Sequence, residues 1–177
     1  PMDVTKIAAG RAVPADINVV IEIPANADPV KYELDKESGA MYVDRFLHTA
    51  MYYPSNYGFI PHTLSDDGDP TDAMVMGQVP VQPGVIIRSR PIGVLMMEDE
   101  SGLDEKILCV PVDDLHPYYG NVGSYRDLRP VMLDQIAHFF EHYKDLERGK
   151  WAKIKGWGEA EQAMDLIRDA MERAKGK

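Results

Sequence analysis

The hydrophobic period of this sequence changes near residue 127, and that change constrains the fold more than any other feature. Before it, short apolar or alternating stretches rich in Val, Ile and Tyr are separated by Gly, Pro and acidic residues, as strands joined by tight turns are. Strands are predicted for residues 17–23, 30–34, 41–47, 73–79, 85–97 and 106–112. Pro91 lies inside the longest of these segments and indicates an edge or a bulge there.

After the change, apolar residues recur at helical spacing. Over residues 128–146 they fall three or four positions apart, with Pro130 in the first turn and Gly149 after the end, as at helix boundaries. Residues 150–157 alternate briefly, and residues 160–174 carry one narrow apolar stripe that predicts a last helix. Closely spaced strands followed by helices predict an α+β fold, a small barrel covered by helices, with two main helices in the C-terminal third.

The length and the charge narrow the classes of protein that this sequence can encode. A chain of 177 residues buries a substantial core and most simply forms one domain, residues 1–177. No apolar stretch approaches the roughly 20 residues that span a bilayer, and no secretory signal is visible. The single Cys109 excludes an intramolecular disulfide, so we expect a cytoplasmic protein. The net charge of −10 opposes binding to nucleic acid or to an anionic membrane.

An Asp-rich turn is the first candidate site. Four carboxylates lie within seven positions of "DDGDPTD", at Asp66, Asp67, Asp69 and Asp72. The Gly and Pro inside this stretch break any helix, so the acids lie on a turn that leads into the strand "AMVMG". Oxygen ligands without Cys or a nearby His suit hard divalent cations.

Two simpler interpretations compete with a catalytic metal site. A calcium EF-hand fails on spacing, because the sixth position counted from Asp67 is Asp72, where Gly is required, and the twelfth is Gln78, where Glu is expected. A solvated acidic turn is the usual meaning of an isolated "DGD". A second acidic segment, "MMEDESGLDEK" (96–106), favours a metal site over a solvated turn, because it also lies at a strand end. Two such clusters could meet and hold several Mg²⁺ ions, an arrangement used in phosphoryl transfer.

Basic residues lie beside these acids. Lys31 neighbours Glu33 in the alternating segment 30–34, and Arg45, Lys106 and Lys144 occur in similar settings. Each one alone is more typical of a surface salt bridge, which contributes little to stability. Together with metal ions they would allow an acidic protein to bind a polyanion.

At this point the residues resemble a known family, the soluble inorganic pyrophosphatases of family I in their bacterial form. The resemblance rests on "EIPANADPVKYELDKESG", "VDRF", "YPSNYGFIPHTL", "DGDPTD", "EDESGLDEK" and "AHFFEHYKDLERGKW", in register from about residue 16 to residue 175. It implies a five-stranded closed β-barrel related to the oligonucleotide-binding fold and a homohexamer built as a dimer of trimers. It also implies hydrolysis of inorganic pyrophosphate to two orthophosphates with several Mg²⁺ ions per subunit, for which Mn²⁺ or Zn²⁺ could substitute.

The resemblance also assigns roles to the acidic residues. Asp69 would be the general base, and Glu22 would belong to an outer set of carboxylates. The positions that match the family's metal ligands are Asp67, Asp72 and Asp104, joined by Asp99 and, for further ions, by Glu33 or Glu100.

The remaining roles concern the substrate and the assembly. The positions that match the family's phosphate-binding residues are Lys31, Arg45, Tyr57, Lys106, Tyr143 and Lys144. His138 and His142 are spaced for a shared metal, but no third ligand is in view and no Glu follows the first His, so we interpret them as residues of the trimer–trimer interface.

Three other functions remain as alternatives. A two-metal phosphatase acting on a nucleotide or sugar phosphate is opposed by the absence of a P-loop sequence. An oligonucleotide-binding module is opposed by the net charge. A calcium-binding structural protein would bind metal but catalyse no reaction.

Overall fold

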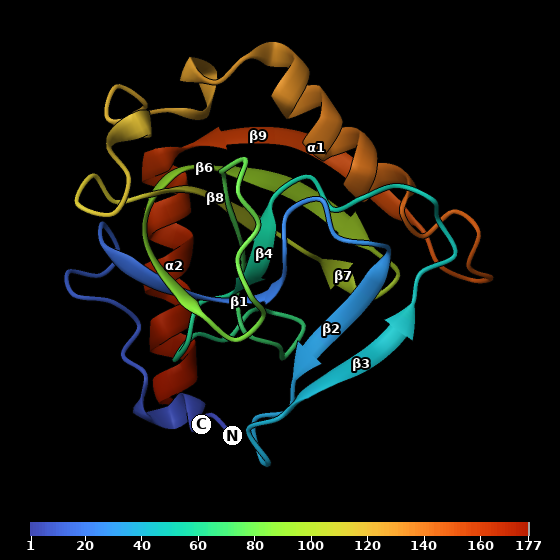
Figure 1. The fold of residues 1–177 in the computed structure, drawn as a ribbon, viewed down its shortest axis with the longest axis horizontal. Helices are drawn as coiled ribbons and strands as arrows, with labels where there is room; N and C mark the ends of the chain where they lie inside the picture. The colour runs from blue at the N-terminus through green and yellow to red at the C-terminus, as the bar shows by residue number, and fades with distance from the viewer. Residues whose placement is uncertain (177) are drawn as a thin grey trace.

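A ring of hydrogen-bonded strands forms the centre of the computed structural model, which describes residues 1–176 (Figure 1). In the order of their pairing, the ring strands are β1 (Ile17–Ile23), β4 (Asn56–Phe59), β5 (Asp72–Val75), β8 (Lys106–Pro111) and β6 (Ile86–Asp99). β6 pairs again with β1 and so closes the ring. The ring pairs are antiparallel except β5 with β8, which is parallel. The predicted closed sheet of five strands is therefore confirmed.

β6 is the longest strand and links the ring to the rest of the sheet. It also pairs with β7 (Gly102–Leu103) and with β9 (Ala152–Glu159). Its register against β8 shifts between Pro91 and Gly93. The shift is a bulge at the proline that the sequence marked, and it bends the strand so that one segment serves several partners.

A separate hairpin projects beside the ring. It consists of β2 (Val30–Leu34) and β3 (Met41–Phe46), which pair antiparallel and place Lys31 opposite Arg45. Figure 1 shows the hairpin on the opposite side of the ring from α2 (Ala160–Lys175). The hairpin thereby carries two basic side chains to one side of the ring.

Two α-helices follow in the C-terminal part of the described chain, as predicted. α1 (Pro130–His142) buries Ile136, Phe139 and Phe140 in the core cluster that also contains Tyr57. α2 (Ala160–Lys175) buries its small apolar stripe in a core cluster shared with β1, β5, β6 and β8. Short 3-10 helices are η1 (Val4–Lys6), η2 (Pro117–Tyr119) and η3 (Tyr125–Asp127). None of the described helices is long and apolar enough to cross a membrane.

The boundaries differ from the prediction in several places; β5, for example, ends at Val75, four residues before the end of the predicted segment 73–79. The helical pattern was expected to continue to residue 146, but α1 ends at His142, and residues 143–150 form turns. In that segment, the backbone amides of Asp145 and Glu147 donate hydrogen bonds to the carbonyls three residues earlier. This spacing is typical of a tight turn, whereas an α-helix uses a spacing of four. The strand β4 was not predicted, because its four residues are all buried and so show no alternation.

Gly58 in β4 marks the tightest contact of the ring. A Cβ atom added there would lie 1.7 Å from the carbonyl oxygen of Val20 in β1. No side chain fits in that space, so only glycine allows β4 to pair with β1 at this position.

We predict that Gly58→Ala lowers the free energy of unfolding by about 3 kcal/mol, because two paired strands must separate to admit the methyl group. Chemical denaturation followed by circular dichroism would measure the loss. Gly77→Ala is the matched control, since a Cβ atom there meets nothing within 4 Å. Equal stability of the two variants would contradict the steric account.

Candidate active site

One cavity gathers every side chain that the sequence assigned to metal, catalysis or substrate. It has a volume of about 290 Å³ and opens at one edge of the ring. The residues of the prediction that line it are Glu22, Lys31, Glu33, Arg45, Tyr57, Asp67, Asp69, Asp72, Asp99, Glu100, Asp104, Lys106, Tyr143 and Lys144. Lys36, Tyr53, Ser101 and Lys150 also line it and were not assigned a role from the sequence.

The ring topology explains why the acidic residues meet. Because β5 and β8 run parallel, their first residues, Asp72 and Lys106, lie side by side in register. The Asp-rich turn precedes β5, and Asp104 precedes β8, so both deliver carboxylates to the same edge. β6 runs antiparallel to β8 and ends there with Asp99.

Lys106 is the central cation of this edge. Its side chain is almost fully buried, and its ammonium donates hydrogen bonds to Asp72 at 3.0 Å, to Asp104 at 3.2 Å and to the Tyr57 hydroxyl at 2.6 Å. Burial alone would lower the pKa of Lys106, but Asp104 and Asp72 outweigh it and raise that pKa well above the ordinary value. The amine therefore stays charged.

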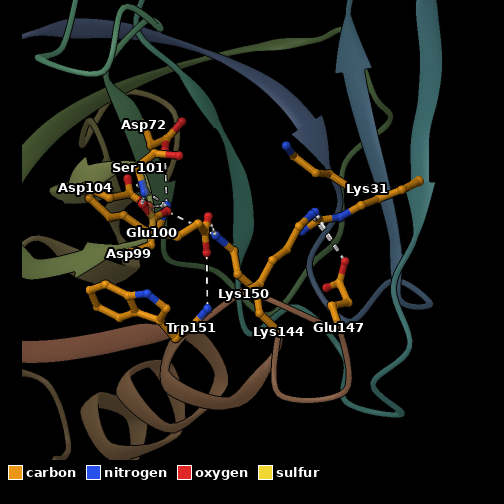
Figure 2. Close-up of polar contacts among 12 residues, drawn as sticks. Lys31, Asp72, Asp99, Glu100, Ser101, Asp104, Lys144, Glu147, Lys150 and Trp151 are labelled. Atoms are coloured by element: carbon orange, nitrogen blue, oxygen red, sulfur yellow. Dashed lines mark hydrogen bonds and ion pairs between the residues drawn. The ribbon is translucent and has the colours of Figure 1, made fainter.

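Lys144 makes a second set of ion pairs. Its Nζ atom donates to Asp99 at 3.0 Å and to Glu100 at 3.2 Å, and these contacts cross from the turn after α1 to the end of β6 (Figure 2). The backbone amide of Trp151 donates to the other oxygen of Glu100 at 3.1 Å. Lys144 and Trp151 therefore orient the acidic segment from the side of the C-terminal third.

The carboxylates are crowded enough to perturb their own ionisation. Burial raises the pKa of Glu22 to about 7, against the opposing effect of the Leu34 amide, which donates to Glu22 at 2.8 Å. Burial and the neighbouring charge of Asp69 also raise the pKa of Asp67, against the hydrogen bond that the Asp69 amide donates to it. Such shifts indicate excess negative charge, which a bound cation would relieve.

The additional acidic residue of the turn faces elsewhere. Asp66 lies 3.3 Å from Arg173 of α2 and does not line the cavity. Arg173 also donates to the Leu64 carbonyl, and the Leu64 amide donates to the Ala170 carbonyl at 3.0 Å. The last turns of α2 therefore hold the start of the Asp-rich turn.

His138 and His142 lie outside the cavity. Their rings are 4.7 Å apart on α1, and His142 Nδ1 is 2.7 Å from Asp145. His138 borders a shallow surface hollow with Tyr52 and Val131, both of which are exposed.

Comparison with known proteins decides the family. The model of the inorganic pyrophosphatase family matches residues 19–175. An inorganic pyrophosphatase of Caulobacter vibrioides is 64% identical over 172 residues, which cover 97% of each chain. A crystal structure described as an inorganic phosphatase of Anaplasma phagocytophilum matches with a TM-score of 0.94 at 51% identity and covers 96% of this chain and 99% of its own. The inorganic pyrophosphatase of Thermus thermophilus has a TM-score of 0.92 at 38% identity, with 99% and 100% covered.

The chain belongs to the inorganic pyrophosphatase family. This membership confirms the predicted family, the bacterial type of family I, and the enzyme class, a hydrolase of inorganic pyrophosphate. Family I pyrophosphatases are metal-dependent. Of the cavity residues without an assigned role, Lys150 lies inside the matched motif "DLERGKW", which was the available signal for it.

We predict that Glu22→Gln stabilises the metal-free pyrophosphatase above pH 7. Between the ordinary pKa of 4.5 and the folded value of about 7, the unfolded chain releases a proton that the folded chain keeps. Stability therefore falls as the pH rises through this window, and it stays low above it. Glutamine keeps the acceptor for Leu34 without the charge, so the variant should gain about 2 kcal/mol at pH 8 and much less at pH 5.

Urea denaturation with a chelator at fixed protein concentration would measure both values. Glu172→Gln, on the exposed face of α2, is the control. A gain at pH 8 no larger than at pH 5 would refute the account.

Proposed function

We propose that this pyrophosphatase hydrolyses inorganic pyrophosphate with several Mg²⁺ ions, that Asp69 is the general base, and that water is the nucleophile. The observation that carries the proposal is the division of one cavity between a carboxylate edge and a set of cations. The carboxylate edge suits hard metal ions, and the cations suit phosphate oxygens. A small polyanion can bridge the two only in the presence of metal.

The donor set fits divalent ions. Its members are all carboxylates, the ligands that hard divalent ions prefer. Asp72 and Asp104 already bind one positive charge, because the Lys106 ammonium lies within 3.1 Å of both. Within residues 1–176, no three acidic, imidazole or thiolate side chains converge as a finished chelate, so ion binding would require these carboxylates to turn toward one another. We propose Asp67, Asp72 and Asp104 for the first ions and Asp99, Glu33 and Glu100 for further ones.

Mg²⁺ would supply Lewis acidity there, which lowers the pKa of a coordinated water and neutralises phosphate charge. Mn²⁺ or Zn²⁺ could replace it. The Glu22 carboxylate lines the same cavity and would adjust the charge of this set.

The position of Asp69 supports its proposed role as the general base. Its side chain lines the cavity and is exposed, and its amide donates to Asp67 at 2.9 Å, which ties the two residues together within the turn. A general base needs to be within hydrogen-bond reach of the proton that it abstracts. Asp69 is more exposed than Asp72 and Asp104, so its carboxylate is accessible to a proton donor in the cavity.

The phosphate groups would be held by cations and hydroxyls. Lys31, Arg45, Lys106 and Lys144 line the cavity and need no covalent step to stabilise the charge of a transferring phosphoryl group. Burial raises the pKa of Tyr57 and of Tyr143, so both hydroxyls stay protonated donors. Tyr57 accepts from Lys106, which leaves its own proton free to bind an oxygen of the substrate.

We further propose a cytoplasmic homohexamer, a dimer of trimers, with His138 and His142 near a subunit interface. Support comes from the surface of α1, where Val131 is 58% exposed and, with His138, borders the hollow that also contains Tyr52. Exposed apolar side chains around a hollow are typical of surfaces that contact protein.

Asp69→Asn should lower kcat for orthophosphate release by about 10²- to 10⁴-fold, because the variant keeps the shape of the side chain and cannot accept the proton. The natural protein should release orthophosphate with Mg²⁺ and lose that activity with chelator. Asp66→Asn is the matched control from the same turn and should stay within about threefold of the natural rate, since Asp66 pairs with Arg173 outside the cavity. Full activity of Asp69→Asn would discard the general base.

The assembly gives a second prediction. Sedimentation of the natural protein should give six subunits, and the double variant His138→Glu and His142→Glu should give smaller particles. The substitutions add negative charge beside Glu141 and Asp145, which both neighbour His142. Lys175→Glu, on the far end of α2, should leave the size unchanged. A double variant that sediments like the natural protein would place these residues away from the interface.

A further inference from the structure

The cations of the cavity differ in their carboxylate partners. Lys106 and Lys144 pair with acids that themselves line the cavity. Arg45 and Lys150 instead share Glu147, which does not line the cavity. Within residues 1–176, Glu147 is the only carboxylate within 4.0 Å of either cation.

Glu147 connects two separate parts of the chain. It lies in the turn after α1, and Arg45 lies on β3 of the projecting hairpin. The Oε1 atom of Glu147 is 3.3 Å from Arg45 Nη1 and 3.5 Å from Lys150 Nζ. The carboxylate is the most buried of the three groups, with 10% of the side chain exposed against 23% for Arg45 and 35% for Lys150. Figure 2 shows Glu147 and Lys150 away from Asp72 and Asp104.

The ion pairs are not arranged for greatest stability. One oxygen of Glu147 serves both cations, while its Oε2 atom and the Nε atom of Arg45 are buried without a hydrogen-bond partner. An unpaired buried polar atom costs about 1 to 3 kcal/mol. A contact that served only to join β3 to the turn would use both oxygens. The observed arrangement instead fixes two cations with a single negative charge, so that a net positive charge remains at the cavity wall.

We propose that Glu147 is a positioning residue that holds Arg45 and Lys150 as a two-cation clamp for one phosphoryl group of pyrophosphate. The inference rests on the proposed function and adds Lys150 to the substrate-binding set. Fixed charges stabilise a transition state well because they need not reorganise during the reaction. Without Glu147, two like charges beside each other would repel, and their side chains would have to be ordered in each catalytic cycle.

Steady-state kinetics of Glu147→Gln in the full chain, with saturating Mg²⁺, tests this proposal. Glutamine keeps the size and an acceptor oxygen but removes the charge. We expect kcat to fall about 10- to 100-fold. KM should change less than about threefold, because the loss of order in Arg45 and Lys150 weakens substrate binding while the loss of the negative charge of Glu147 strengthens it. Glu172→Gln breaks an exposed ion pair with Lys175 and should change neither constant.

A mutant cycle separates positioning from a general effect on the fold. In a background of Arg45→Met and Lys150→Met, Glu147→Gln should lower kcat by less than about threefold, because no cation remains to be positioned. A loss as large as in the natural background would overturn the proposal, as would unchanged kcat in the single variant.

If Glu147→Gln fails to fold by circular dichroism, Lys150→Met replaces it. That variant leaves the Arg45–Glu147 pair in place and should fold normally with kcat lowered about tenfold; an unchanged kcat would refute the clamp. Absence of orthophosphate release from the natural protein would reject the proposed function and this inference together. Normal release with an unaffected variant would reject the inference alone.

Discussion

The buried ammonium of Lys106 is the interaction on which the acidic edge depends. It stands between Asp72 and Asp104 and beneath the Tyr57 hydroxyl, where an uncompensated carboxylate pair would be too costly to bury. Removing one partner of such a cluster typically costs 3 to 5 kcal/mol. The negative charge of this edge, which we propose binds metal, is therefore tolerated only because the same strand edge supplies its own cation.

Each part of the site is tied to a different structural element, and the elements control different properties. The parallel pair of β5 and β8 sets the spacing of the carboxylates, the turn after α1 supplies Lys144 and Glu147, and the hairpin supplies Lys31 and Arg45. α2 reaches the Asp-rich turn through Arg173 and Asp66. Cations from the hairpin and from the turn after α1 thus line the cavity of a protein whose net charge is −10.

The sequence alone predicted most of this architecture. Strong alternation placed β1 and β2 at their observed limits, and the helical stripe placed α2 within one residue at its end. The prediction failed where hydrophobic periodicity is absent. β4 is buried on both faces, and it needs glycine at position 58 because the backbone of β1, a strand distant in the sequence, lies against it. The prediction overextended α1 because apolar spacing persists through Leu146, although the backbone leaves the helix after His142.

The candidate site shows the same limit. The acidic clusters can be recognised along the chain, and the roles of the individual positions were assigned through the motifs that resemble the family. Their partners could not be recognised, because pairs such as Arg45–Glu147 join residues about a hundred positions apart and leave no local pattern. Likewise, the sequence shows that Asp66 adds a negative charge to the turn. It does not show that this side chain pairs with Arg173, because that contact depends on the packing of α2.

The parallel pairing of β5 with β8 also bears on how the chain folds. Asp72 and Lys106 are 34 positions apart, and the whole of β6 lies between them in the sequence, so their contact requires a long loop to close first. No early local structure can contain the site. It should be gained and lost together with the ring in one cooperative transition, and a partly folded chain would have no preformed site with which to bind metal or substrate.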